Sequence, residues 1–99
     1  MDGPRQGRQS IRIGADHPSL PGHFPGAPVV PGVVLLDRIA AALEHAGAGR
    51  LAYVGAVKFA APLLPEQDAE LSWTLDGVRV SFRIERAGST ILSGQGEVA

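Results

Sequence analysis

The chain has 99 residues, a formal net charge of −1 and no cysteine. A chain of this length forms one small domain. The charge balance argues against a nucleic-acid-binding protein, which usually carries a basic excess. The absence of cysteine excludes a disulfide framework, a thiolate metal site and a cysteine nucleophile. Hydrophobic residues make up 44% of the sequence, which is enough for a folded core.

The first ten residues are polar and contain no apolar segment, so no signal peptide is expected. No apolar run approaches the roughly 20 residues that cross a bilayer. We therefore expect a soluble, cytoplasmic protein that binds neither membrane nor nucleic acid. Its organisation should be a flexible N-terminus over residues 1–8 and a single domain over residues 9–99.

The first predicted element is a short strand over residues 9–14, where Ile11 and Ile13 alternate with polar residues. Residues 15–32 then hold five of the eight prolines. Proline at this density excludes both a helix and a central strand. A loop of this length in so short a chain is more often functional than a plain connection.

The next segment predicts one helix, from Val33 to Ala46, with Gly47 or Gly49 ending it. Its apolar residues cover more than half of the circumference, which indicates a helix enclosed by other structure. They are Val33, Leu35, Leu36, Ile39, Ala40 and Leu43.

Four strands are predicted after the helix. Residues 51–61 are apolar on nearly both faces, as in a buried central strand, and residues 69–75 alternate between apolar and polar. Asp76-Gly77 predicts a hairpin turn. A strand that places Val78, Val80, Phe82 and Ile84 on one face comes next, and a turn at Gly88-Ser89 leads to a last strand over residues 90–98.

One helix with a wide apolar surface needs a sheet that curls around it. The predicted fold class is therefore α+β, with a curved antiparallel sheet wrapped around a central helix.

The proline-rich segment also places three kinds of reactive group near one another in the sequence. His23 lies between prolines, which restrict its backbone and preorganise a base. Gly32 and Val33 open the helix, where backbone amides are unpaired and carry the positive end of the helix dipole. These amides suit a carbonyl oxygen that gains negative charge. With Asp37 as an acid, this set meets the needs of β-elimination beside a thioester.

Each of these features also has a structural interpretation. A single loop histidine is more often a hydrogen-bonding residue, and Pro-Gly before a helix is ordinary at helix starts. Asp37 lies on the same side of the helix as Arg38, Ala41, Glu44 and His45, which is typical of a solvent-facing stripe. Geometry alone leaves both interpretations open.

Residues 22–28, Gly-His-Phe-Pro-Gly-Ala-Pro, followed by Pro31-Gly32, resemble the signature of the β-hydroxyacyl-acyl-carrier-protein dehydratases of fatty-acid synthesis. Residues 57–65 are similar to a later Lys-Phe-x-x-Pro-x-x-Pro strand of that family. The resemblance covers about residues 9–98. It implies a hot-dog fold whose two subunits join edge to edge.

The resemblance also implies roles for single residues. His23 would exchange the proton at C2 of the acyl chain, and Asp37 would protonate the departing 3-hydroxyl group. The histidine of one subunit would meet the acid of the other. The substrate-binding residues would be Phe24, Pro31, Gly32 and Val33, with the amide of Gly32 on the thioester carbonyl.

No cofactor and no metal are implied, because the substrate is itself carried on a phosphopantetheine thioester. The expected partners are an acyl carrier protein or coenzyme A as the substrate carrier, and a second subunit in a homodimer or in a heterodimer with a longer hot-dog homologue. Typical members have an additional N-terminal strand before the segment that starts here near Gln9. Glu66-Gln67 stands where the family often has Gly-Asp, which predicts a changed turn.

The leading hypothesis is a 3-hydroxyacyl-thioester dehydratase that forms a trans-2-enoyl thioester in fatty-acid or polyketide- and polyene-type biosynthesis. A hot-dog acyl thioesterase shares the fold and the helix acid but does not need the His-Phe-Pro-Gly segment. A non-catalytic partner subunit of a heterodimeric dehydratase is the third hypothesis. The presence of both His23 and Asp37 argues against it, since a scaffold needs neither.

Overall fold

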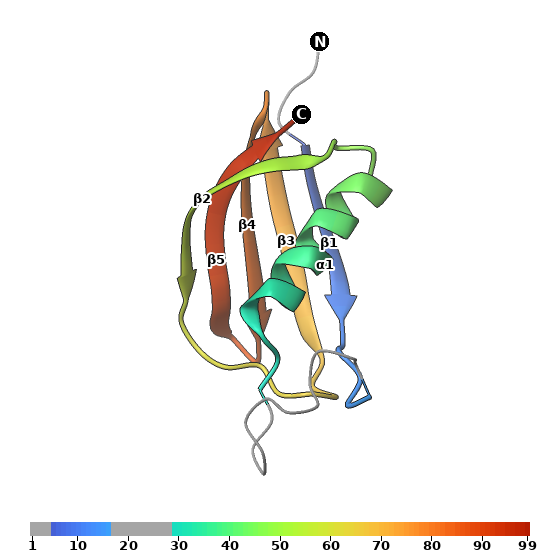
Figure 1. Cartoon of the computed structure of the whole chain (residues 1–99), viewed down its shortest axis with the longest axis vertical. Helices are drawn as coiled ribbons and strands as arrows, with labels where there is room; N and C mark the ends of the chain where they lie inside the picture. The colour runs from blue at the N-terminus through green and yellow to red at the C-terminus, as the bar shows by residue number, and fades with distance from the viewer. Residues whose placement is uncertain (1–4, 17–28) are drawn as a thin grey trace.

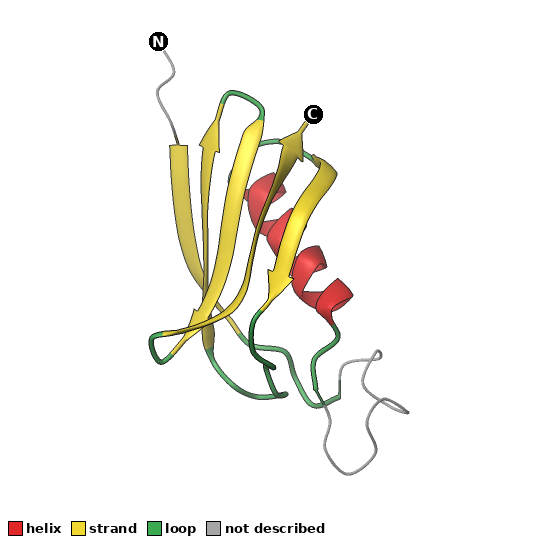
Figure 2. Cartoon of the chain, turned by 90° about the vertical axis from the view of Figure 1, so that its left-hand side faces the viewer, coloured by secondary structure: helices red, strands yellow, loops and turns green. Residues whose placement is uncertain are grey.

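A computed structural model describes residues 5–16 and 29–99 of the chain. Within these residues the elements are β1 (Arg5–Ile11), α1 (Gly32–His45), β2 (Leu51–Phe59), β3 (Ala69–Asp76), β4 (Arg79–Arg86) and β5 (Ser89–Val98). The five strands form one antiparallel sheet in the order β1-β3-β4-β5-β2. The sheet curves, and α1 lies across one of its faces (Figures 1 and 2). This arrangement confirms the predicted α+β class.

Strand β1 begins earlier than the sequence predicts, at Arg5 instead of Gln9, and it ends at Ile11. All of it pairs with β3, from Arg5 opposite Leu75 to Ile11 opposite Ala69. Residues 5–8 are therefore part of the sheet, and their assignment to a flexible terminus was wrong. These residues were missed because they are polar on both faces, so they carry no alternating apolar pattern.

Helix α1 starts and ends one residue before the predicted bounds, at Gly32 and His45. Its C-terminus is a Schellman motif, in which the amide of Gly47 donates to the Glu44 carbonyl (3.0 Å) and that of Ala48 to the Leu43 carbonyl (2.9 Å). Gly47 adopts the left-handed conformation that this motif needs (φ 70°), so of the two predicted stops, Gly47 and Gly49, it is Gly47 that ends the helix. The Arg5 guanidinium donates to the Ala46 carbonyl (2.7 Å), a favourable position for a cation beside the negative end of the helix.

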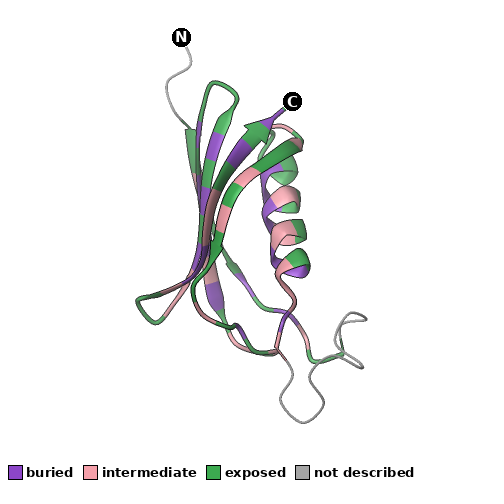
Figure 3. Cartoon of the chain, turned by 60° about the vertical axis from the view of Figure 1, so that its left-hand side comes forward, coloured by how far each residue is buried: buried purple, intermediate pink, exposed green. Residues whose placement is uncertain are grey.

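The buried side of α1 differs from the predicted one. Its buried residues are Val34, Leu35, Ile39, Ala42 and Leu43, whereas Val33 is 63% exposed. Within the described chain the helix is covered on one side only, and the side away from the sheet is exposed or half-buried (Figure 3). The described residues of the single chain therefore do not enclose the helix as predicted.

Strand β2 lies at the edge of the sheet and pairs only with β5 among the described strands. It ends at Phe59, and Tyr53 and Phe59 are 60% and 54% exposed. The prediction of a buried central strand over residues 51–61 was wrong. An apolar pattern on both faces shows that a strand suits apolar surroundings, but it does not say which elements supply them.

Strands β3, β4 and β5 form the predicted meander, and their apolar residues face α1. Leu71, Ile84 and Leu92 are fully buried there, together with Ile39 and Leu43 of the helix. The first turn is Gly77-Val78, because Asp76 pairs with Arg79, so Val78 is an exposed turn residue and not part of β4. The second turn is Ala87-Gly88, one residue before the predicted one, because Arg86 pairs with Ser89.

No helix within residues 5–16 and 29–99 is long and apolar enough to cross a membrane.

Candidate active site

The start of α1 presents backbone amides without partners among the described residues. Pro31 is the N-cap, has an extended backbone (φ −61°, ψ 144°) and makes no side-chain cap. Its carbonyl accepts a hydrogen bond from the amide of Val34 (3.0 Å). The amides of Gly32 and Val33 have no acceptor in the described part of the chain. The first turn also contains no acidic residue, so no side chain of the helix itself offsets the positive end of the helix dipole there.

Gly32 is in direct contact with the ring of Phe59 at the end of β2. A Cβ atom built on Gly32 would stand 2.5 Å from Cε1 and 2.7 Å from Cζ of that ring. A larger residue at position 32 would therefore fit only if the ring of Phe59 moved. Phe59 was not predicted as a site residue, because its strand was expected to be buried. The available signal was the Lys-Phe pair in the second block that resembles the dehydratases.

Asp37 is exposed on the outward side of α1, close to Val33. The two residues are one turn apart, about 6 Å along the axis and about 40° around it. Gly32 and Asp37 are five positions apart, which separates them by about 140° around the axis. Ala41, Glu44 and His45 are also exposed on this side and Arg38 is half-buried, so the predicted polar stripe is a surface of the single chain.

The other predicted site residues divide between described and undescribed parts of the chain. His23 and Phe24 lie outside the described residues, so their roles remain predictions. Pro31, Gly32 and Val33 lie together at the start of α1. The structure thus places Pro31, Gly32 and Val33 at the start of α1, with Gly32 against Phe59, and Asp37 farther along the same helix.

A depression of about 680 Å³ lies elsewhere, on the face of the sheet opposite α1. Ser72, Arg83 and Ser93 line it, and none of the predicted site residues does. Its Arg83 pairs with Glu85 (3.7 Å) and its Arg8 pairs with Glu70 (3.5 Å); the arginine side chains are more than half exposed and the glutamate side chains are partly exposed. Exposed, balanced pairs of this kind are typical of a solvated strand face. Within the described residues no group of three or more acidic, histidine or cysteine side chains is placed to bind a metal ion.

Two solved structures are similar to the chain over nearly its whole length. The dehydratase heterocomplex ApeI:P from Xenorhabdus doucetiae has a TM-score of 0.83 at 22% identity, over 95% of this chain and 87% of that one. The (R)-hydratase from A. caviae involved in PHA biosynthesis has a TM-score of 0.72 at 17% identity, over 97% and 94%. At these identities the likeness shows the fold alone. The protein has the hot-dog fold, as the resemblance predicted.

Sequence comparison then gives the family. A FabZ 3-hydroxyacyl-[acyl-carrier-protein] dehydratase of Haemophilus influenzae (strain PittEE) is 34% identical over 102 residues, and one of Mannheimia succiniciproducens is 32% identical over 101 residues. The chain spans 64% and 63% of the length of these relatives, with 88% of its own length matched. The profile of the ApeI-like family, described as ApeI dehydratase, matches residues 4–95, and the chain belongs to this family.

Proposed function

We propose that this protein is a dehydratase that converts a 3-hydroxyacyl thioester into a trans-2-enoyl thioester and water. The substrate would be carried by an acyl carrier protein or coenzyme A, in fatty-acid or polyketide- and polyene-type biosynthesis in the cytoplasm. The observation that carries the proposal is the start of α1, where the amides of Gly32 and Val33 have no acceptor among the described residues and Gly32 lies against the ring of Phe59. Membership of the ApeI-like family supports it, as do the dehydratase relatives.

In the proposed reaction, His23 and Asp37 each transfer one proton. His23 removes the proton from C2, and the electron pair of that C–H bond forms the C2–C3 double bond. The C3–O bond breaks, and Asp37 protonates the departing hydroxyl group, so that water leaves. The amide of Gly32 donates a hydrogen bond to the thioester carbonyl, whose oxygen gains negative charge as the C2–H bond breaks. Phe24, Pro31 and Val33 contact the substrate.

This reaction requires no metal and no redox cofactor, because only protons move and the backbone amide stabilises the developing charge. The substrate brings its own phosphopantetheine arm.

We further propose that the protein works as a dimer joined through β2. Tyr53 and Phe59 are exposed apolar residues of this edge strand, and an unpaired apolar edge is normally covered by another chain. The opposite edge, β1, is polar. The wide angle between Gly32 and Asp37 on one helix supports a site in which the acid comes from the second subunit. That subunit is a second copy or another hot-dog protein; a similar structure is described as a heterocomplex.

The test of the proposed reaction is a direct assay. The purified chain is incubated with 3-hydroxyacyl thioesters of several lengths, on coenzyme A and on an acyl carrier protein, and the enoyl product is measured by absorbance and mass spectrometry. Enoyl thioester formation supports the dehydratase. Release of free thiol without an enoyl product would replace it by a thioesterase. Activity that requires a second hot-dog protein would favour the partner-subunit hypothesis.

A further inference from the structure

A row of cationic and hydroxyl side chains crosses the face of the sheet that points away from α1 (Figure 2). Strand pairing places one residue of each strand in register, in the order Arg8, Ser72, Arg83, Ser93 and Lys58. We call these residues the cationic row. Residues paired across neighbouring strands share a face of the sheet, and the chain neighbours of the row are buried on the other face, namely Trp73, Phe82 and Leu92. Cations therefore alternate with short hydroxyl side chains across the whole width of the sheet.

The cationic row has a regular spacing and lies in a hollow of the surface. Neighbouring strands are about 4.8 Å apart, so cations on every second strand lie about 10 Å apart. All residues of the row line the depression of about 680 Å³ on this face. Beside the row, Thr74, Ser81 and Gln95 are also in register and line the same depression. Because these side chains and the two serines of the row are not charged, the cations are the main charges that a partner lying across the strands would meet.

The cations of the row are only weakly engaged within the chain. Arg8 lies 3.5 Å from Glu70, and Arg83 lies 3.7 Å from Glu85, with the two arginine side chains 70% and 55% exposed. Lys58 is exposed and forms no ion pair with another described residue. Exposed pairs of this kind are weak. Carboxylates of a partner can therefore replace them at little cost.

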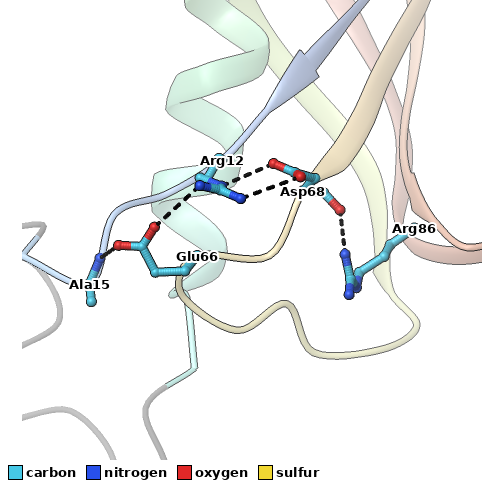
Figure 4. Close-up of polar contacts among 5 residues, drawn as sticks. All are labelled: Arg12, Ala15, Glu66, Asp68 and Arg86. Carbon is cyan, nitrogen blue, oxygen red and sulfur yellow. Dashed lines mark hydrogen bonds and ion pairs between the residues drawn. The ribbon is translucent and has the colours of Figure 1, made fainter.

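Arginines near the turn between β2 and β3 differ from those of the row, because they hold parts of the fold together (Figure 4). The Arg12 guanidinium donates to the Asp68 carboxylate with two contacts (3.0 and 3.4 Å), and Arg86 donates to the Asp68 carbonyl (2.8 Å). The Glu66 carboxylate lies 3.8 Å from Arg12 and accepts a hydrogen bond from the backbone amide of Ala15 (3.0 Å). The cations of the row donate no hydrogen bond to another described residue. Their charges are not used in this way by the described part of the fold.

We propose that the cationic row is a docking surface for an acidic helix of a partner protein. A helix rises 1.5 Å per residue, so side chains seven positions apart lie about 10 Å apart along one line. This distance matches the spacing of Arg8, Arg83 and Lys58. A helix that lies across the strands, with a carboxylate at every seventh position, would place one carboxylate on each cation above the short serines. Complementary charge of this kind gives specificity and fast association. The docking surface does not depend on the proposed reaction.

A second copy of this chain matches the row less well than a foreign helix does. The exposed side of α1 has Asp37 and Glu44 seven positions apart, but the first turn of the helix contains no third acid. Contact between α1 of one copy and the sheet of the next would also be head-to-tail, and such contacts continue into filaments unless they close into a ring. The row therefore suits a partner whose helix carries three carboxylates in one line.

The test measures the binding of a defined peptide to the whole chain by fluorescence anisotropy. The probe is a labelled, alanine-rich helical peptide with three glutamates at intervals of seven positions, which places them on one line. The control peptide has the same composition with the glutamates at intervals of five positions, which spreads them around the helix. We expect the probe to bind about tenfold more tightly than the control, because the control can form only one of the three ion pairs. The affinity of the probe should fall as salt is added.

Substitutions in the row have matched controls elsewhere on the surface. Lys58→Gln should weaken binding of the probe about two- to fivefold, whereas Arg50→Gln, at an exposed cation outside the row, should leave it unchanged. Glu85→Gln should strengthen binding, because it removes the carboxylate that competes for Arg83. Glu44→Gln makes the same change of net charge on α1 and should have no effect. All of these positions are on the surface, so Tm should stay nearly constant and report that the fold is retained.

Three results would overturn the proposal. Equal affinity for the two peptides would show that the row does not select the spacing of the carboxylates. Equal effects of Lys58→Gln and Arg50→Gln would show that only net charge matters. Self-association of the chain that Lys58→Gln abolishes, without binding of the probe, would assign the row to a second copy. Because no thioester is used, these measurements are independent of the proposed reaction: a protein that forms the enoyl product but does not prefer the probe would keep the dehydratase and lose the docking surface.

Discussion

The ring of Phe59 covers the α-carbon of Gly32, so the end of an edge strand meets the first turn of the only helix in the described chain. The contact leaves no space for a Cβ atom on Gly32. It therefore connects the exposed strand β2 to the amide of Gly32, which we assign to the thioester carbonyl. A substitution at either of these two residues should therefore affect the position of the other.

We expect Gly32→Ala to displace the ring of Phe59 and to lower kcat/KM about tenfold or more. Because that ring is half exposed and can move, the loss of stability should be only about 1 kcal/mol. In a Phe59→Ala background the clash is absent, and the better helix propensity of alanine should make Gly32→Ala neutral or stabilising. A double-mutant cycle by urea unfolding measures this coupling. Additive effects would show that the two residues do not clash.

His23→Ala should abolish dehydration while the fold is retained, because it removes the proposed base. General bases of this kind typically contribute a factor of about 10² to 10⁴ to the rate. Far-UV circular dichroism and Tm report on the fold, and enoyl formation reports on the activity. Retained turnover would exclude the proposed mechanism.

Asp37→Asn should reduce the rate by a factor comparable to that of His23→Ala, because asparagine cannot supply the proton to the leaving hydroxyl group. Glu44→Gln, at another exposed acid of α1, is the matched control and should leave the rate unchanged. Near-normal activity of Asp37→Asn would show that Asp37 is a solvent-facing residue of the helix and not the acid of the reaction.

Tyr53→Lys should weaken the dimer without unfolding the subunit. Tyr53 is largely exposed in the single chain, and a lysine on an edge strand opposes pairing with another edge. Gln9→Lys places the same charge on the opposite edge, in β1, and should have no effect. Light scattering coupled to gel filtration, over a range of concentrations, measures the change. A dimer that dissociates only with Gln9→Lys would place the interface at β1.

Ala87→Asn should stabilise the protein. Ala87 and Gly88 both have positive φ (51° and 80°) in the two-residue turn between β4 and β5, a geometry that favours Asn-Gly. The relief should be about 1 kcal/mol, which corresponds to a rise in Tm of about 4–8 °C for a domain of this size. Val78→Asn is the control, because Val78 does not have a positive φ in its turn. An equal gain from both variants would show that conformational strain at Ala87 is not the cause.

The sequence by itself determined the order of the elements, the alternation of β3 and β4, and a helix end at Gly47 or Gly49. These features depend on residues close together in the chain: period-two burial, turn residues and a glycine with positive φ. The motif around His23, and with it the dehydratase family, was also readable from local residues alone.

The tertiary structure decided what lies beside what. It moved β2 to the edge of the sheet and turned Val33 outward. It brought Phe59 onto Gly32, and Glu66 onto Ala15. Hydrophobicity indicates that a side chain suits apolar surroundings, but the position of a strand in a sheet depends on pairing between distant segments. The polar residues of β1 show no alternating apolar pattern, so the start of this strand could not be predicted. The contact of Glu66 with Ala15 depends on the topology of the fold and not on the residues next to either of them in the sequence.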